Sequence, residues 1–190
     1  MNLAAKIISV VFNPLVVSPF TFYILIFNDN NPNEYLLLFI AIFFSSVLPF
    51  SYIIYFKKLG KISSLEAPIR KQRLDLLVIS SLYNSLAFIL LKYFHASNIV
   101  QGLMFCYALN TAITWYITRY WKISIHMIGL GGPFIALILS GYNNLIIMIL
   151  IIISVYLSRI KLKAHNHLQL IAGTFLAVAL AYIELTYLFL

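Results

Sequence analysis

Two short polar segments, each placed between long apolar runs, carry side chains of types that act on phosphate groups. Their residues are Lys122, Ser124 and His126 in the first segment, and Ser158, Arg159, His165 and Gln169 in the second. Arginine holds phosphate oxygens through two parallel N–H bonds, and a serine hydroxyl adds a further donor. One neutral imidazole can attack phosphorus while a second, protonated imidazole gives its proton to the leaving oxygen.

A third polar segment, after the second apolar run, contains Arg70 and Arg73 in the spacing R-x-x-R. These guanidinium groups are further candidates for phosphate binding, although Arg70 and Lys71 could equally form a basic loop that faces lipid head groups. Gln169 follows His165 by four residues, so both side chains share one face if a helix has begun there.

Composition sets the environment in which these groups must work. The chain has 190 residues, of which 63% are hydrophobic and only 9% are charged, and its mean hydropathy is +0.97. Soluble domains carry about 25% charged residues. The sequence therefore predicts an all-α, polytopic membrane protein that forms a single transmembrane domain over residues 1–190.

Apolar runs long enough to cross a bilayer predict a bundle of six to seven helices. The expected spans are 7–27, 35–56, 76–94, 99–118, 127–141, 143–157 and 168–189. The fifth and sixth are short, and Gly129, Gly131, Gly132 and Pro133 are expected to interrupt the fifth. The first run has no evident cleavage site and is expected to be retained.

The basic residues are distributed unevenly between the two ends of this bundle. With seven spans, all but one of the 13 Lys and Arg residues fall on the side of the N-terminus, and only Lys92 lies toward the other. This brings the three polar segments to one membrane face, which the positive-inside rule makes cytoplasmic. Phosphate-binding cations would weaken that argument, so the side of the site stays open. The net charge of +8 fits phospholipid or a phosphorylated ligand, and we expect no nucleic-acid partner.

The second segment resembles the signature S-R-x5-H-x3-D of the type 2 phosphatidic acid phosphatase superfamily, with Gln169 at the position of the aspartate. The sequence KISIH resembles that family's P-S-G-H signature, with Ser124 and His126 retained. The K-x6-R-P signature is matched by Arg73, which Leu74 follows, and Glu66 stands at the position of its lysine.

The resemblance implies a membrane phosphatase with a bundle of about six helices, no metal and no cofactor. It makes His165 the nucleophile, held by Gln169, and His126 the acid and then the base. Phosphate-binding residues would be Arg73, Arg70, Lys122, Ser124, Ser158 and Arg159. The implied substrate is a lipid phosphate or polyprenyl diphosphate in the cell (inner) membrane. The alternative is an inactive relative that binds or carries a phosphorylated lipid.

Other interpretations of the same residues remain open at this stage. A zinc site built from His126, His165 and His167 is conceivable, although neighbouring cations would repel a metal. The glycines of the fifth span could permit close helix packing or a close approach to phosphate. Glu184 and Asn110 lie within spans, where an interhelical hydrogen bond is the commonest explanation.

Overall fold

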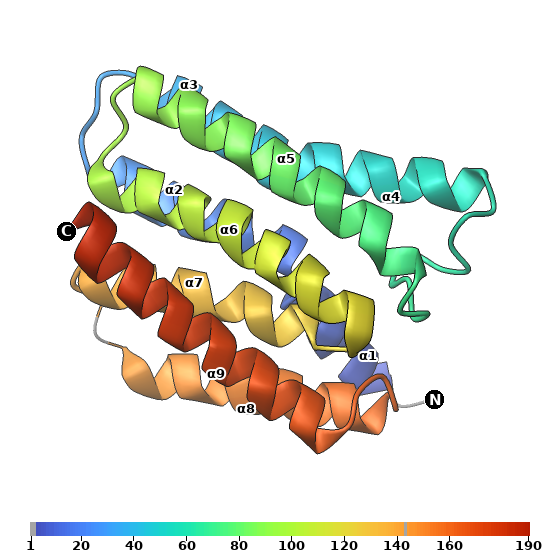
Figure 1. Cartoon of the computed structure of the whole chain (residues 1–190). Helices are drawn as coiled ribbons and strands as arrows, with labels where there is room; N and C mark the ends of the chain where they lie inside the picture. The colour runs from blue at the N-terminus through green and yellow to red at the C-terminus, as the bar shows by residue number, and fades with distance from the viewer. Residues whose placement is uncertain (1–2, 143) are drawn as a thin grey trace.

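A computed structural model describes residues 3–142 and 144–190, which form an all-helical bundle (Figure 1). Helix makes up 79% of the chain, and the described residues contain no β-strand. The α-helices are Leu3–Val11 (α1), Pro14–Phe27 (α2), Glu34–Ile42 (α3), Leu48–Lys58 (α4), Gln72–Tyr93 (α5), Asn98–Tyr120 (α6), Ile125–Leu139 (α7), Leu145–Lys161 (α8) and His167–Glu184 (α9). Two π-helical turns, Phe43–Val47 and Leu185–Phe189, follow α3 and α9.

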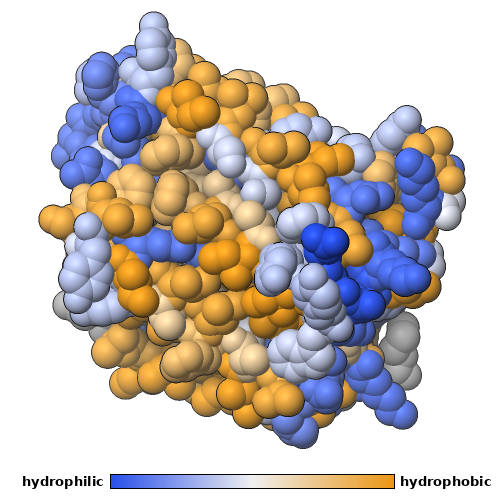
Figure 2. Space-filling view, in the orientation of Figure 1, coloured by the Kyte–Doolittle hydropathy of each residue, from blue (hydrophilic) through white to orange (hydrophobic). Residues whose placement is uncertain are grey.

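Several of these helices are suited to a membrane. Glu34–Lys58, Gln72–Tyr93 and His167–Phe189 are each long and apolar enough to cross one, and the pair α1 and α2 qualifies if its two members form one span. Helix α7 is apolar but shorter. Figure 2 shows apolar side chains across the middle of the molecule and hydrophilic side chains toward its ends. The predicted membrane character is thus supported through apolar helices of membrane length.

The first predicted span, 7–27, is broken rather than continuous. Helices α1 and α2 meet at an angle of 44°. The side chain of Asn13 accepts a hydrogen bond from the backbone N–H of Leu15, and Pro14 occupies the first position of α2. Asparagine is a favoured N-cap and proline is tolerated in the first turn, so these two residues start a new helix at the bend.

The second span contains the π turn between α3 and α4. Ser45 and Ser46 are consecutive, yet both are buried and both line the same cavity. The wider turn alters the ordinary helical spacing of side chains, and such turns are frequent at functional sites. Ser45 also exchanges a hydrogen bond of 2.7 Å with Ser18 of α2, which ties this turn to the neighbouring helix.

The predicted interruption of the fifth span is absent, because α7 continues through Pro133. Its glycines instead permit close helix packing. A Cβ at Gly129 would lie 2.3 Å from Pro14 Cγ, and one at Gly131 would lie 2.5 Å from Ala177 Cβ. Both distances are shorter than real contacts, so α2 and α9 approach α7 at points where a side chain would not fit.

The bundle brings the three predicted polar segments to one end. Figure 1 shows α3, α4 and α5 along one side, α7, α8 and α9 along the other, and α2 and α6 between them. Lys122 donates to the carbonyl of Ala164 over 2.9 Å, and Arg70 donates to the carbonyl of Thr118 over 2.8 Å. Segments after α4, α6 and α8 therefore meet, as the loop order predicts.

Candidate active site

A cavity of about 780 Å³ opens at this end of the bundle and extends inward between α2, α4 and α5. Its charged and polar lining at the mouth comes from six residues, each in a different helix or connecting segment. These residues are Ser9, Glu66, Arg73, His126, Arg159 and His165. Four of them were predicted from the sequence as catalytic or phosphate-binding, and the fold brings those four to one hollow.

His165 lies in the turn between α8 and α9, and its imidazole is buried. Its Nδ1 is 2.9 Å from Gln169 Oε1, which also accepts the backbone N–H of Asn166 over 3.4 Å. Two donors therefore meet this oxygen, so it is the amide oxygen of Gln169 that faces the ring. In the neutral imidazole Nδ1 carries the hydrogen, and Nε2 keeps the lone pair that a nucleophile needs.

The position of Gln169 follows from local sequence. Asn166 is the N-cap of α9, and its side chain accepts the backbone N–H of Gln169 over 2.9 Å, while the Gln169 side chain reaches back to the backbone of Asn166. This reciprocal arrangement is a capping box. The capping box at the start of α9 thus holds the Gln169 side chain in place. Its Oε1, which accepts from the backbone of Asn166, is also the atom that orients His165.

Burial is the main reason that the pKa of His165 is lowered to about 4, and the nearby cations Arg73, Lys122 and Arg159 act in the same direction. The hydrogen bond with Gln169 opposes this shift. A histidine with a pKa near 4 is neutral at pH 7. Burial, followed by the charges of Arg73 and Arg159, also lowers the pKa of Lys122.

His126 is the second residue of α7, and its imidazole is also buried. Nε2 lies 3.1 Å from the carbonyl oxygen of Ser9. A carbonyl can only accept, so Nε2 carries a hydrogen and Nδ1 is the nitrogen left to exchange a proton. His126 and His165 line the same cavity and lie close enough to interact electrostatically.

Arg159 is 2% exposed and is the most deeply placed cation of the site. Its NH1 donates to the hydroxyl of Ser9 over 2.6 Å and to the carboxylate of Glu66 over 3.1 Å. Its Nε is buried with no hydrogen-bond partner among the described residues. A buried guanidinium with an unsatisfied donor is costly, which favours an anionic ligand close to this side chain.

Arg73, the second residue of α5, is 4% exposed and lines the cavity. Its Nε donates to the carbonyl of Ala67 over 2.7 Å. Its two terminal nitrogens make no hydrogen bond within the described part of the chain. Those terminal groups are the planar fork that recognises phosphate oxygens. Arg73 and Arg159 therefore supply two guanidinium groups beside the two imidazoles.

The remaining predicted residues serve the scaffold in this structure. Ser124 is the N-cap of α7 and accepts the N–H of Met127, and Ser158 donates to the carbonyl of Ala5 over 2.6 Å. Arg70 also donates to the carbonyl of Arg119 and does not line the cavity. Lys122 bonds to the carbonyl of Ala164, beside the turn that carries His165.

Sequence reasoning missed Ser9, which connects the two halves of the site. Its hydroxyl accepts from Arg159, and its carbonyl accepts from His126. The only signal in the sequence is the spacing of Ser9, four residues after Ala5, in an apolar segment. In the structure Ala5 and Ser9 are the buried residues of α1. That pattern marks a packed face without indicating which distant side chains it meets.

Beyond the mouth, one face of α5 continues the cavity wall inward. Arg73 is followed on this face by Leu76, Leu77, Ser80 and Asn84, all of which line the cavity. From Arg73 to Asn84 the helix axis rises about 16 Å, which is half the thickness of a bilayer core. The cavity therefore joins a cationic mouth to a largely apolar interior.

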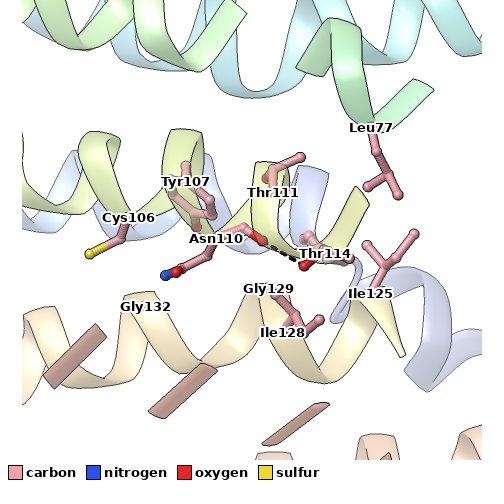
Figure 3. A pocket seen from close by; sticks show the side chains of 11 residues that line it. Leu77, Cys106, Tyr107, Asn110, Thr111, Thr114, Ile125, Ile128, Gly129 and Gly132 are labelled. Atoms are coloured by element: carbon pink, nitrogen blue, oxygen red, sulfur yellow. Dashed lines mark hydrogen bonds between the residues drawn. The ribbon is translucent and has the colours of Figure 1, made fainter. Parts of the chain in front are cut away.

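A second, much smaller cavity of about 70 Å³ lies beside the first (Figure 3). Its lining includes Asn110 and Thr114, and the Thr114 hydroxyl donates to the Asn110 carbonyl over 2.6 Å. The Asn110 amide donates to the carboxylate of Glu184 over 3.1 Å. This is the interhelical hydrogen bond expected for these two residues, and the small cavity has no charged lining residue.

The histidines do not form a metal centre. In residues 3–142 and 144–190, no group of three or more His, Cys, Asp or Glu side chains could hold a metal ion. His167 instead pairs with the Tyr156 hydroxyl over 2.6 Å. The arrangement that remains offers two arginines suited to binding a phosphoryl group and two imidazoles suited to nucleophilic attack and proton transfer.

Comparisons with family models, with curated proteins and with solved structures found no match for this chain. Functional inference therefore depends on the residues and geometry of the cavity.

Proposed function

We propose that this chain is a membrane-embedded phosphatase that hydrolyses a lipid phosphate or polyprenyl diphosphate through a phosphohistidine intermediate. A single observation carries the proposal, which is that His126, His165, Arg73 and Arg159 line one cavity. These residues come from distant parts of the sequence, and each has the side-chain type that phosphoryl transfer requires. The resemblance of their sequence segments to the type 2 phosphatidic acid phosphatases points to the same reaction.

In the first step, the lone pair of His165 Nε2 attacks phosphorus, and the bond from phosphorus to the leaving oxygen breaks. That oxygen takes a proton from Nδ1 of His126 and leaves as the alcohol of a lipid phosphate or as the monophosphate of a polyprenyl diphosphate. A phosphate monoester has its second pKa near 6, so substrate that binds as the monoanion can supply this proton to His126. Arg73 and Arg159 neutralise the charge on the remaining phosphoryl oxygens.

In the second step, His126 Nδ1 removes a proton from water, and the water oxygen bonds to phosphorus as the bond to His165 Nε2 breaks. His126 Nδ1 then returns this proton to the phosphate, which leaves as H₂PO₄⁻, and both imidazoles are back in their neutral starting state. Gln169 holds the ring of His165 throughout and supplies no charge. Since an aspartate would stabilise the positive charge that forms on the ring during attack, a neutral partner gives a slower first step.

The apolar interior of the cavity supports a lipid rather than a water-soluble substrate. A hydrocarbon chain that enters past Arg73 would lie along Leu76 and Leu77, with the phosphate held at the mouth. Burial of each CH₂ group contributes about 0.8 kcal/mol. The chain thereby supplies binding free energy that inorganic phosphate lacks.

The same function fits a bundle that crosses the cell (inner) membrane six or seven times. In that arrangement α6, α7 and α8 also cross, and the glycine contacts of α7 hold a short helix between its neighbours. The basic end of the molecule then faces the cytoplasm by the positive-inside rule.

Phosphate release from the purified protein tests the function directly. Phosphatidic acid, phosphatidylglycerol phosphate and undecaprenyl diphosphate are offered in detergent, with and without a chelator. We expect release from at least one of them, resistant to the chelator and lost in His165→Ala and His126→Ala. His95→Ala, an exposed histidine at the opposite end, is the matched control. No release from any substrate under these conditions would refute the proposal.

A second candidate is a non-catalytic protein that binds or carries a phosphorylated lipid. The neutral Gln169 beside His165 favours this function, because glutamine lacks the negative charge with which an aspartate at this position would assist the nucleophile. Saturable binding of a lipid phosphate without turnover, together with a large gain of activity in Gln169→Asp, would identify this function.

A further inference from the structure

The segment that precedes α5 crosses the mouth of the cavity. Leu65, Glu66 and Ala67 all line the cavity, and the carboxylate of Glu66 lies 3.1 Å from NH1 of Arg159. The two partners are exposed very differently, since the side chain of Arg159 is 2% exposed and that of Glu66 is 42% exposed. A half-exposed acid therefore reaches in to a cation that the fold has already buried.

The second arginine holds the same segment. Arg73 donates to the carbonyl of Ala67 over 2.7 Å. Ala67 has a φ of 42°, in the left-handed region that residues with a Cβ rarely adopt. Both guanidinium groups that face the cavity are thus engaged by adjacent residues, one through a carboxylate and one through a carbonyl.

We propose that Glu66 is a built-in competitor for the phosphate site, which keeps the phosphodiester head groups of surrounding lipids off Arg159 and admits terminal phosphates. This inference depends on the proposed function in taking a phosphorylated lipid as the ligand. Carboxylate and phosphate are alternative partners for the same guanidinium fork, so a phosphate must displace Glu66 before it can contact the NH1 group.

The chemistry of the two kinds of lipid decides the outcome of this competition. A phosphodiester has one negative charge and two unesterified oxygens, whereas a terminal phosphate carries up to two charges and three acceptor oxygens. Displacement of Glu66 costs both ligands the same free energy. The weaker diester then falls below the affinity needed to occupy the site, even at its high concentration in the bilayer, while the terminal phosphate still binds.

Binding of orthovanadate, a phosphate analogue, to the full chain in detergent tests the competition. We expect Glu66→Gln to bind orthovanadate about 3- to 10-fold more tightly than the wild type, because the competing charge is gone. Glu66→Asp, whose shorter side chain reaches less far, should fall between them. Asp75→Asn removes an exposed negative charge from the first turn of α5, and the affinity of this variant should stay within about twofold of wild type.

The role of the lipid is tested in mixed micelles of a detergent that contains no phosphate group, with or without added phosphatidylglycerol. Phosphatidylglycerol should weaken orthovanadate binding to Glu66→Gln at least about threefold and leave the wild type nearly unchanged. Unchanged or weaker binding by both Glu66 variants, or equal inhibition of wild type and Glu66→Gln by the diester, would overturn the inference. These readouts need no turnover. Tighter binding by Glu66→Gln without phosphate release from any lipid would therefore refute the phosphatase and leave the competition intact.

Discussion

His165 donates its Nδ1–H to the side-chain oxygen of Gln169 over 2.9 Å, and this bond fixes which nitrogen of the ring faces the cavity. The partner is neutral, so it orients the imidazole and raises its pKa through the hydrogen bond, but it places no negative charge beside the ring. An acidic side chain of the same length would supply both effects. The difference between orientation and charge can therefore be measured at this one position.

Gln169→Glu should raise the phosphate-release rate about 10- to 1,000-fold, because a carboxylate stabilises the positive charge that develops on His165. Glutamate has the same length as glutamine, so its side chain can keep the position of Gln169 in the capping box of α9. Gln169→Leu, which has no acceptor, should lose activity instead. Initial rates under saturating lipid phosphate provide the measurement, and equal rates in all three proteins would show that this contact has no part in turnover.

Acid should destabilise the fold through His165. Its pKa is lowered to about 4 in the folded chain and is about 6.5 in an unfolded one. Between these values the unfolded chain binds more protons, so stability falls as pH decreases from about 6.5 to about 4. Thermal unfolding in detergent should show a decrease in Tm over this range. His165→Gln cannot titrate, and its Tm should fall less over the same interval.

Ser9→Ala should weaken orthovanadate binding about 10-fold or more, since it removes the acceptor that orients NH1 of Arg159. The backbone carbonyl that receives His126 Nε2–H is retained in this variant. Ser140→Ala is the control, because the Ser140 hydroxyl bonds only within its own helix end, to the carbonyl of Ala136. Comparable losses in both variants would argue against a specific role for Ser9.

Asn110→Leu should lower the free energy of unfolding by about 1–3 kcal/mol, because it removes the amide that donates to the buried carboxyl of Glu184. Glu184→Gln preserves an acceptor for the Asn110 amide and should have little effect. Denaturation in mixed micelles gives the comparison. A destabilised Glu184→Gln protein would indicate that the charge of the carboxyl, rather than the hydrogen bond, matters for folding.

The sequence was sufficient for the helices and for the meeting of the polar segments. Apolar length placed a helix at 76–94, and the structure has Gln72–Tyr93. Loop order placed the histidines and arginines at one end, because each pair of antiparallel helices returns the chain to the same side. This order places His126, His165, Arg73 and Arg159 at one end, whereas their meeting in one cavity depends on how the helices pack.

Sequence patterns failed where tertiary packing decides the outcome. The glycines of α7 fit two interpretations of the sequence, a broken helix or close helix packing, and in the structure they accommodate Pro14 and Ala177 while the helix continues. A glycine that breaks a helix and one that lets a neighbour approach look the same in a sequence. The contacts of Ser9 and the inward reach of Glu66 likewise depend on helices that are far apart along the chain.

The hydrogen bonds that Ser9 accepts from His126 and Arg159 also constrain when the site can exist during biosynthesis. The first helix emerges from the ribosome long before its partners at positions 126 and 159 have been translated. The lining of the cavity is therefore complete only after His165 has been translated, and translation products that end before it cannot contain the site. Any truncation that removes the N-terminal helix should likewise leave the imidazole and guanidinium groups without their common anchor.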